Sequence, residues 1–130
     1  MKRKNISSDS PWEDVVGYSR AVQLGDWLLI SGTTAVLNGD VQFPGDARSQ
    51  AIFIFNKIEE QLRACGMVLG DVVRTRMYVT DIQQWEAVAE THSQFFSQIK
   101  PAATMVEVNA LIHPDLVIEI EVDAFRSIPE

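Results

Sequence analysis

The sequence predicts an α+β fold in which two helices cover one face of a mixed β-sheet. Two segments each carry a single apolar stripe at helical spacing, and several short segments rich in β-branched and aromatic residues have the composition of strands. Their order along the chain is strand pair, helix, strand, helix, strand, strand. Because each helix has one apolar stripe, each needs a sheet face to cover, and roughly four to six strands provide it. The 130 residues fit one domain that spans the whole chain.

The N-terminal part is predicted to open with a loose arm and to continue as a hairpin. Residues 1–13 are polar, so we expect them to form the arm. Gly25-Asp26 lies between the apolar runs 19–24 and 27–31, which is typical of a two-residue hairpin turn. A second turn is predicted at Asn38-Gly39-Asp40.

Both helices have start and stop signals. Asp46 can cap the first helix, and Gly66 can end it in a left-handed conformation. Asp81 can cap the second helix, and Pro101 follows its end. The apolar stripes are Ala51, Phe55, Ile58, Leu62 and Cys65 in the first helix, and Trp85, Val88, Ala89, His92, Phe96 and Ile99 in the second.

The last predicted strand, 116–125, alternates strictly between apolar and acidic residues. Its acidic face carries Glu119, Glu121 and Asp123. The strand predicted at 72–80 has Arg74, Arg76 and Tyr78 on one face and Val73, Thr75, Met77 and Val79 on the other. Because the carboxylates would repel one another without cations opposite, we expect the arginine face and the acidic face on the same side of the sheet. A further strand is predicted at 104–108.

Two interpretations of this charged face remain open. It is either a solvated face with compensating charges or a polar site lined by Glu119 and Arg76. Loss of ligand binding in the Arg76→Ala variant, with an unchanged fold, would favour the site.

Composition argues against several function classes. Lys and Arg total 11 against 18 Asp and Glu, so the net charge of −7 repels nucleic-acid backbones. No apolar run approaches the roughly 18 residues that cross a bilayer. A signal-peptide segment is also absent, so we expect a cytoplasmic protein that binds no membrane. Dinucleotide and ATP motifs are missing, and we therefore expect no cofactor.

The histidines and the single cysteine give no sign of a metal site. His92 and His113 are not at metal-ligand spacing, and no cysteine cluster joins them, so we expect no metal. His92 lies on an apolar helix stripe and is expected to be packed in the core or at an interface. Cys65 ends the other stripe, which predicts a buried, inert thiol.

Four stretches, taken in order, cover nearly the whole chain and together resemble one known family. They are Gly17-Tyr18-Ser19 with residues 25–32, residues 71–81, Phe95-Phe96 with Pro101-Ala102, and Val106-Glu107-Val108 with residues 118–121. This ordered set resembles the RidA (YjgF/YER057c/UK114) family. The resemblance implies a chorismate-mutase-like α+β domain and a homotrimer in which three sheets pack into a barrel-like centre. It also implies small-molecule clefts between subunits, in which reactive enamines and imines are hydrolysed to keto acids and ammonia.

The chain departs from that family at the motif that carries the chemistry. Active RidA proteins have Pro-Ala-Arg, and the arginine binds the substrate carboxylate with its planar fork of donors. Here the stretch is Pro101-Ala102-Ala103, so this anchor is missing. Met105 stands where the family often has cysteine, which makes this wall of the cleft larger and more apolar.

Other positions of the implied cleft are retained. Tyr18 matches the family's pocket tyrosine, Gly32 its cleft-lining glycine, and Glu119 the glutamate that holds the attacking water. Ser31 and Thr33 flank Gly32, and their hydroxyls either serve the turn or bind the ligand. Arg76 either restores anion binding from another strand or pairs with Glu121 or Glu119.

Two functions from different classes follow. One is hydrolytic deamination of an imine- or enamine-type metabolite, with Glu119 positioning water and a substrate that lacks the usual carboxylate contact. The other is a non-catalytic trimer that binds or senses a small metabolite in the same cleft. The sequence does not name the ligand.

Overall fold

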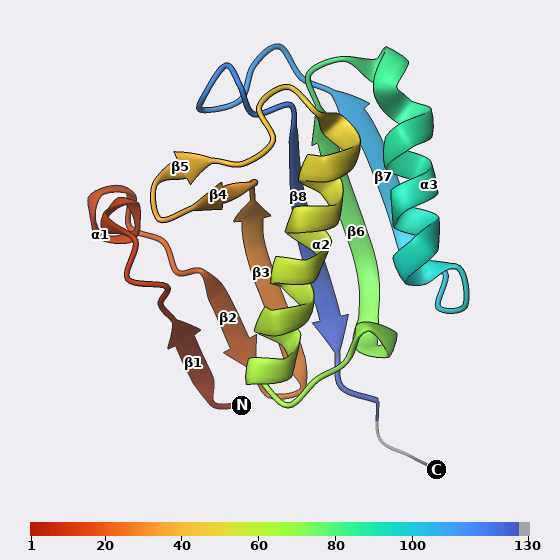
Figure 1. The fold of residues 1–130 in the computed structure, drawn as a ribbon. Coiled ribbons are helices and arrows are strands. Elements are labelled where there is room, and N and C mark those ends of the chain that lie inside the picture. Colours follow the sequence, from red (N-terminus) through yellow and green to blue (C-terminus); the bar gives the residue numbers. More distant parts are fainter. Residues whose placement is uncertain (128–130) are drawn as a thin grey trace.

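The structure, a computed structural model that describes residues 1–127, is built on a six-stranded mixed sheet in the order β1-β2-β3-β8-β6-β7 (Figure 1). The parallel pair in this sheet is β6 with β7, and the other neighbours run antiparallel. The strands are β1 (Arg3–Ile6), β2 (Ala21–Leu24), β3 (Trp27–Thr33), β6 (Val72–Val79), β7 (Ala102–Glu107) and β8 (Ile118–Phe125). A separate ribbon is formed by β4 (Val36–Leu37) and β5 (Asp40–Val41). The helices are α1 (Pro11–Val16), α2 (Ala47–Ala64) and α3 (Trp85–Phe96), with short 3-10 turns at Leu69–Asp71 and Ile82–Gln84.

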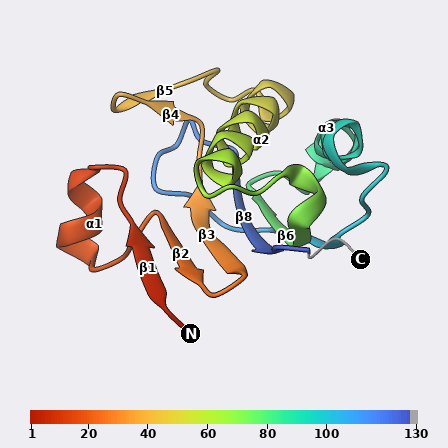
Figure 2. The same ribbon diagram turned by 90° about the horizontal axis from the view of Figure 1, so that it is seen from below.

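The two long helices lie on the same face of the sheet, as predicted, and Figure 2 shows the opposite face free of helices in the described part of the chain. On the covered face, Ile118, Ile120, Val122 and Ala124 of β8 are fully buried, as are Phe55 and Leu62 of α2. The α+β class and the alternation of the last strand are therefore confirmed. The open face is the acidic one, and it has consequences for the site described below.

The predicted capping signals act at the helix starts, with one difference. The Asp46 side chain accepts a hydrogen bond from the Ser49 backbone amide at 3.0 Å, which fixes the start of α2. Asp81 caps the 3-10 turn Ile82–Gln84, and that turn leads directly into α3. Trp85, which was placed on the apolar stripe, begins α3 and is half-exposed rather than packed.

The predicted loose arm is wrong. β1 pairs antiparallel with the whole length of β2, and α1 follows it. Glu13 of α1 is buried, and its carboxylate accepts a hydrogen bond from the Ser8 backbone amide at 3.1 Å and another from the Ser8 hydroxyl. Backbone pairing and one buried carboxylate hold this segment in place. Because neither interaction needs apolar side chains, the segment can be polar and still be ordered.

The assignment of Val73 to the buried face of its strand is also wrong. The register of β6 against β8 passes from Val72 opposite Ala124 to Arg74 opposite Asp123. This bulge leaves Val73 without a partner and 41% exposed, whereas Val72 is buried. Because the bulge lies at the start of β6, the faces of Thr75, Met77 and the arginines remain as predicted.

Helices long and apolar enough to cross a membrane are not found among residues 1–127.

Candidate functional site

The acidic face of β8 lies opposite the arginine and tyrosine face of β6, as predicted. The register places Arg74 opposite Asp123, Arg76 opposite Glu121, and Tyr78 opposite Glu119. Both faces are on the side of the sheet that carries no helix among residues 1–127. Charged groups from two adjacent strands are therefore brought together on one surface.

Arg76 pairs with two of the three carboxylates. Its guanidinium lies 3.3 Å from the Asp123 carboxylate and 3.6 Å from that of Glu121. The Tyr78 hydroxyl donates to Glu121 at 2.7 Å, and this hydrogen bond, followed by burial, raises the pKa of Tyr78. Of the two roles considered for Arg76, pairing with Glu121 is the one that a single chain displays.

Glu119 stands apart from this charge network. In the described residues, its carboxyl forms no ion pair with Arg76, although it lies on the same strand face. Burial raises the pKa of Glu119, while nearby Arg20 lowers it and Glu121 raises it further. A half-buried carboxyl with a raised pKa takes up a proton more readily than a free carboxyl and can return it, which is what general acid–base work requires.

Gly32 is the residue against which the Glu119 carboxyl packs. The register of β3 passes from Ile30 opposite Val122 to Thr33 opposite Ile120, so Ser31 and Gly32 form a bulge. A Cβ atom on Gly32 would overlap the Glu119 carboxyl. Glycine is needed here for close approach, and the Gly32 backbone adjoins the Glu119 carboxyl.

Three further predicted residues lie along the same hairpin. Tyr18 follows the end of α1 and is 37% exposed. The Ser31 hydroxyl donates to the Ser19 carbonyl at 2.6 Å, and the buried Thr33 hydroxyl donates to the Ser31 carbonyl at 2.9 Å. In the single chain both hydroxyls therefore stabilise the bulge, whereas the phenol of Tyr18 is accessible.

Ala103 and Met105 lie elsewhere. In the parallel pairing of β7 with β6, Ala103 is opposite Thr75 and Met105 is opposite Met77. Thr75 and Met77 are buried beneath the helices, so Ala103 and Met105 face the helix side of the sheet. Glu119 faces the other side, and β6 separates β8 from β7. One chain therefore holds two separate groups of predicted site residues.

Comparison with known proteins identifies the family. The family model described as Endoribonuclease L-PSP matches residues 9–126. The chain belongs to this family. A crystal structure of a YjgF/YER057c/UK114 family member from Mycobacterium tuberculosis is similar, with a TM-score of 0.86 and 45% identity over 96% of this chain and 100% of that one.

Relatives with named activities are also similar to the chain. The 2-iminobutanoate/2-iminopropanoate deaminase of Escherichia coli is 30% identical over 126 residues, which cover 95% of this chain and 98% of the relative. The crystal structure of Escherichia coli TdcF with bound serine has a TM-score of 0.77 and 26% identity, and covers 95% of this chain and 94% of that one. The RidA/YjgF resemblance drawn from the sequence is thus confirmed at the level of the family.

One residue beside Glu119 and Gly32 was missed from the sequence. Arg20 donates from Nη2 to the Gly32 carbonyl at 2.5 Å, and burial lowers its pKa. Its Nε atom is buried with no hydrogen-bond partner in the described part of the chain. The available signal was that Arg20 lies within the run 19–24, which otherwise has the pattern of an apolar hairpin strand. A charged residue in such a run indicates a charge directed into the protein.

His92 is packed, as expected. Its Nε2 lies 2.9 Å from the Thr75 hydroxyl, and its ring contacts Phe55 and Phe96. Burial lowers the pKa of His92, so the imidazole is uncharged at neutral pH. It lines a cavity of about 350 Å³ beside the C-terminal end of α3.

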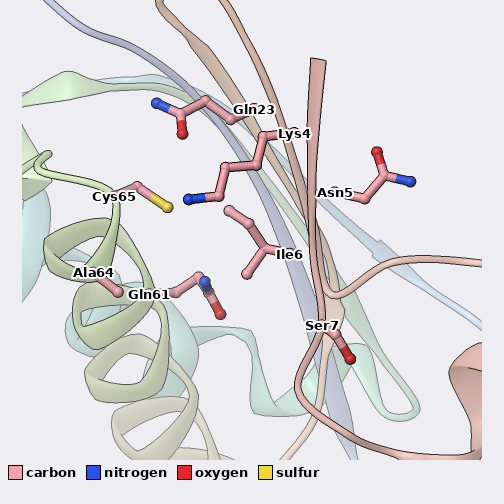
Figure 3. Close-up of a pocket in the computed structure, with 8 residues that line it drawn as sticks. All are labelled: Lys4, Asn5, Ile6, Ser7, Gln23, Gln61, Ala64 and Cys65. Atoms are coloured by element: carbon pink, nitrogen blue, oxygen red, sulfur yellow. The ribbon is translucent and has the colours of Figure 1, made fainter. Parts of the chain in front are cut away.

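A cavity of about 400 Å³ lies between β1 and the C-terminal end of α2, away from Glu119 (Figure 3). It is lined by Lys4, Asn5, Ile6, Ser7, Gln23, Gln61, Ala64 and Cys65. Cys65 is half-buried and borders this cavity, so the expectation of a buried thiol is wrong. Groups of three or more His, Cys, Asp or Glu placed to hold a metal ion are not found among residues 1–127.

Proposed function

We propose that the chain is the subunit of a homotrimeric hydrolase that deaminates small imines or enamines. The observation that carries the proposal is the state of Glu119. It is half-buried against Gly32 and has a raised pKa, whereas its neighbours Glu121 and Asp123 share Arg76. The named deaminase among the relatives acts on imines, which supports this class of reaction.

The reaction balances with water as the only other reactant. Glu119 accepts a proton from water as the water oxygen bonds to the imine carbon, and the electron pair of the C=N double bond moves to nitrogen. The protonated Glu119 then returns the proton to nitrogen. Glu119 then takes the hydroxyl proton of the carbinolamine and delivers it to the amine nitrogen. The C–N bond breaks with its electron pair leaving on nitrogen, the O–H bonding pair forms the carbonyl, and ammonia is released. Tyr18 and the Gly32 backbone would orient the substrate beside this carboxyl.

The two groups of site residues support an assembly of copies. Ala103 and Met105 lie on the edge strand β7, on the face opposite Glu119. Both groups can line one cleft only if a neighbouring copy brings its β7 edge to the Glu119 side. A trimer with three such clefts would use the open, charged face of each sheet as its centre.

Ala103 determines the expected substrate choice. A methyl group offers no donor to a carboxylate, so the β7 wall lacks the charge-assisted fork that arginine would supply. Met105 adds an apolar surface beside it. The site should therefore accept imines without an α-carboxylate at least as well as imines that carry one.

Two imines that share a skeleton test this proposal. One is 2-iminopropanoate, made from alanine with an amino-acid oxidase, and the other is propan-2-imine, made from propan-2-amine with an amine oxidase, both with catalase present. Ketone release in competition with semicarbazide measures hydrolysis. We expect acceleration of both, with kcat/KM for propan-2-imine at least equal to that for 2-iminopropanoate. If the protein accelerates the hydrolysis of neither imine, the proposal is wrong.

The Ala103→Arg variant tests the assignment of the β7 wall. A charge-assisted hydrogen bond contributes about 1.5–3 kcal/mol, so kcat/KM for 2-iminopropanoate should rise about ten- to hundredfold. Propan-2-imine serves as the internal control and should gain nothing.

The loss at Ala103 also favours a second candidate, a trimer that binds a small metabolite without converting it. That alternative predicts saturable binding of a small amide or keto acid by calorimetry, with no acceleration of either imine.

A further inference from the structure

Arg20 is a half-buried cation with an unusual set of partners. It lies just before β2, and its Nη2 donates to the Gly32 carbonyl at 2.5 Å. Its Nε is buried without a hydrogen-bond partner among residues 1–127. The arginine ion pairs in the same residues involve Arg48, Arg63, Arg76 and Arg126, and Arg20 takes part in none of them.

Burying an arginine without a carboxylate beside it is costly, so the contacts it does make are informative. The carbonyl it binds belongs to Gly32, which packs directly on the Glu119 carboxyl. Its charge also interacts with those of Tyr18, Glu13 and Glu119. Arg20 thus acts on the Glu119 site in two ways, through its hydrogen bond to the Gly32 backbone and through its charge.

Arg126 provides a comparison, because its hydrogen bond to a backbone carbonyl is purely structural. It donates to the Cys65 carbonyl at 2.7 Å, and its guanidinium also lies 3.9 Å from the Asp26 carboxylate. It directly follows β8, whereas Glu119 is near the start of that strand. Both arginines hold a carbonyl, but Arg20 alone directs its free charge toward the site carboxyl.

We propose that Arg20 is a positioning residue for Glu119: it holds the Ser31-Gly32 bulge by the Gly32 carbonyl and keeps a positive charge beside the carboxyl. The importance of this positioning for catalysis rests on the proposed function of Glu119. The effect of Arg20 on the location and charge of the Glu119 carboxyl does not depend on that function. The bulge fixes where the carboxyl lies, and the charge favours its ionised form, the form that takes a proton from water. Arg20 acts through Glu119 and is given no contact with substrate.

The other charged groups around Glu119 work in the opposite direction or are already paired. On its own strand, Glu121 raises the pKa of Glu119. Across on β6, Arg76 is held by Glu121 and Asp123, and Tyr78 donates to Glu121.

Behind Arg20, Lys57 of α2 donates to the Val36 carbonyl at 3.1 Å. Burial, followed by the charge of Arg20, lowers the pKa of Lys57. Of the cations near the site, Arg20 is the one whose charge lowers the pKa of Glu119.

Two variants separate the hydrogen bond from the charge. Arg20→Gln keeps a donor for the Gly32 carbonyl and removes the charge, whereas Arg20→Lys keeps the charge and loses the planar fork. Arg126→Gln is the matched control, since it removes the charge from the other arginine that binds a carbonyl. Thermal unfolding of each variant confirms that it is folded before titration.

The readout is the titration of Glu119 followed by carbon-13 NMR of its carboxyl carbon in the protein without ligand, with Glu119→Gln used to assign the signal. In Arg20→Gln the titration midpoint should move to higher pH, because the charge that favours the ionised form is gone. Arg20→Lys and Arg126→Gln should keep the midpoint of the unchanged protein. If Arg20→Gln leaves the midpoint in place or lowers it, the proposal is wrong.

The pH dependence of imine hydrolysis provides the second readout. The acidic limb of the rate profile should move upward with the NMR midpoint in Arg20→Gln, so that the rate falls severalfold below the midpoint and recovers above it. An NMR shift without any hydrolysis in the unchanged protein would reject the proposed function and leave the positioning role intact. A rate profile that fails to move while hydrolysis proceeds would reject the positioning role.

Discussion

Gly32 has no side chain because the Glu119 carboxyl occupies the space that a Cβ atom would fill. In Gly32→Ala the carboxyl is the flexible partner and should swing away, so the fold should survive. Displacement of a catalytic group by about 1 Å can cost about a hundredfold in rate, and we expect a loss of that order in kcat. Gly70→Ala is the matched control, since its Cβ would meet nothing closer than a Val68 methyl at 3.8 Å. Equal rates for the two variants would contradict this account of Gly32.

The raised pKa of Glu119 predicts a pH-dependent stability. Between the ordinary value of 4.5 and the raised folded value, the folded chain binds more protons than the unfolded chain. Stability therefore falls as pH rises through that window, and the penalty is complete above it. Glu119→Gln should be more stable than the unchanged protein at about pH 8 and equal to it at about pH 4, by urea unfolding at fixed protein concentration. The opposite sign at pH 8 would show that ionised Glu119 is stabilised by a partner.

The sequence predicts part of this residue-level picture. Alternation alone separates Glu119, Glu121 and Asp123 from the core, and the family resemblance points to Gly32. The division of labour between the carboxylates depends on which one Arg76 reaches, and side-chain reach across a strand pair has no periodic signature. Arg20 was missed for the same reason, since its role depends on a carbonyl of the neighbouring strand.

At the scale of elements, α1 is held in place by one buried carboxylate. Glu13 accepts hydrogen bonds from Ser8, which lower its pKa, and it ties the end of β1 to the helix. Glu13→Ala should cost about 1–2 kcal/mol of unfolding free energy, because the Ser8 amide and hydroxyl both lose their charged acceptor. Asp14→Ala, one residue along the same helix and exposed, should cost less than about 0.5 kcal/mol. Equal unfolding midpoints for the two variants in urea would argue against this role.

The elements that the sequence predicts well are those whose order depends on burial of apolar side chains. Helices α2 and α3 and strands β6 and β8 each leave a periodic pattern, and their faces were assigned correctly apart from the ends. β1 was missed because an edge strand is held by backbone hydrogen bonds, which do not require apolar side chains. The bulges at Val73 and at Ser31-Gly32 were missed because one extra residue shifts a register without changing composition.

At the scale of the whole molecule, the site is divided between two faces of one sheet. If a neighbouring copy completes it, Glu119→Gln and Met105→Trp should each be inactive alone, one through its carboxyl and the other through a blocked wall. Refolding the two together in equal amounts should restore about one quarter of the wild-type rate, the fraction of clefts that receive both intact sides. Mass spectrometry of the mixed assemblies provides the control for exchange. No recovery in mixed assemblies would place the whole site within one chain.

The family and the α+β class were within reach of the sequence, and the comparisons confirm both. The homotrimer was expected from the family resemblance alone and stays a prediction, because a face that is open in one chain looks the same in sequence whether water or another copy covers it. Either covering, by water or by another copy, is compatible with the charges of Arg74, Arg76 and the three carboxylates.

The central claim is that Glu119 takes the proton from water in imine hydrolysis, and the rate of Glu119→Gln tests it most directly. Glu121→Gln, a change of the same kind two residues along the same strand face, is the control. General acid–base catalysis contributes about 10²- to 10⁴-fold, so kcat of Glu119→Gln on propan-2-imine should fall by that factor with little change in KM. Glu121→Gln should retain most of its activity. Wild-type kcat in Glu119→Gln would contradict the account.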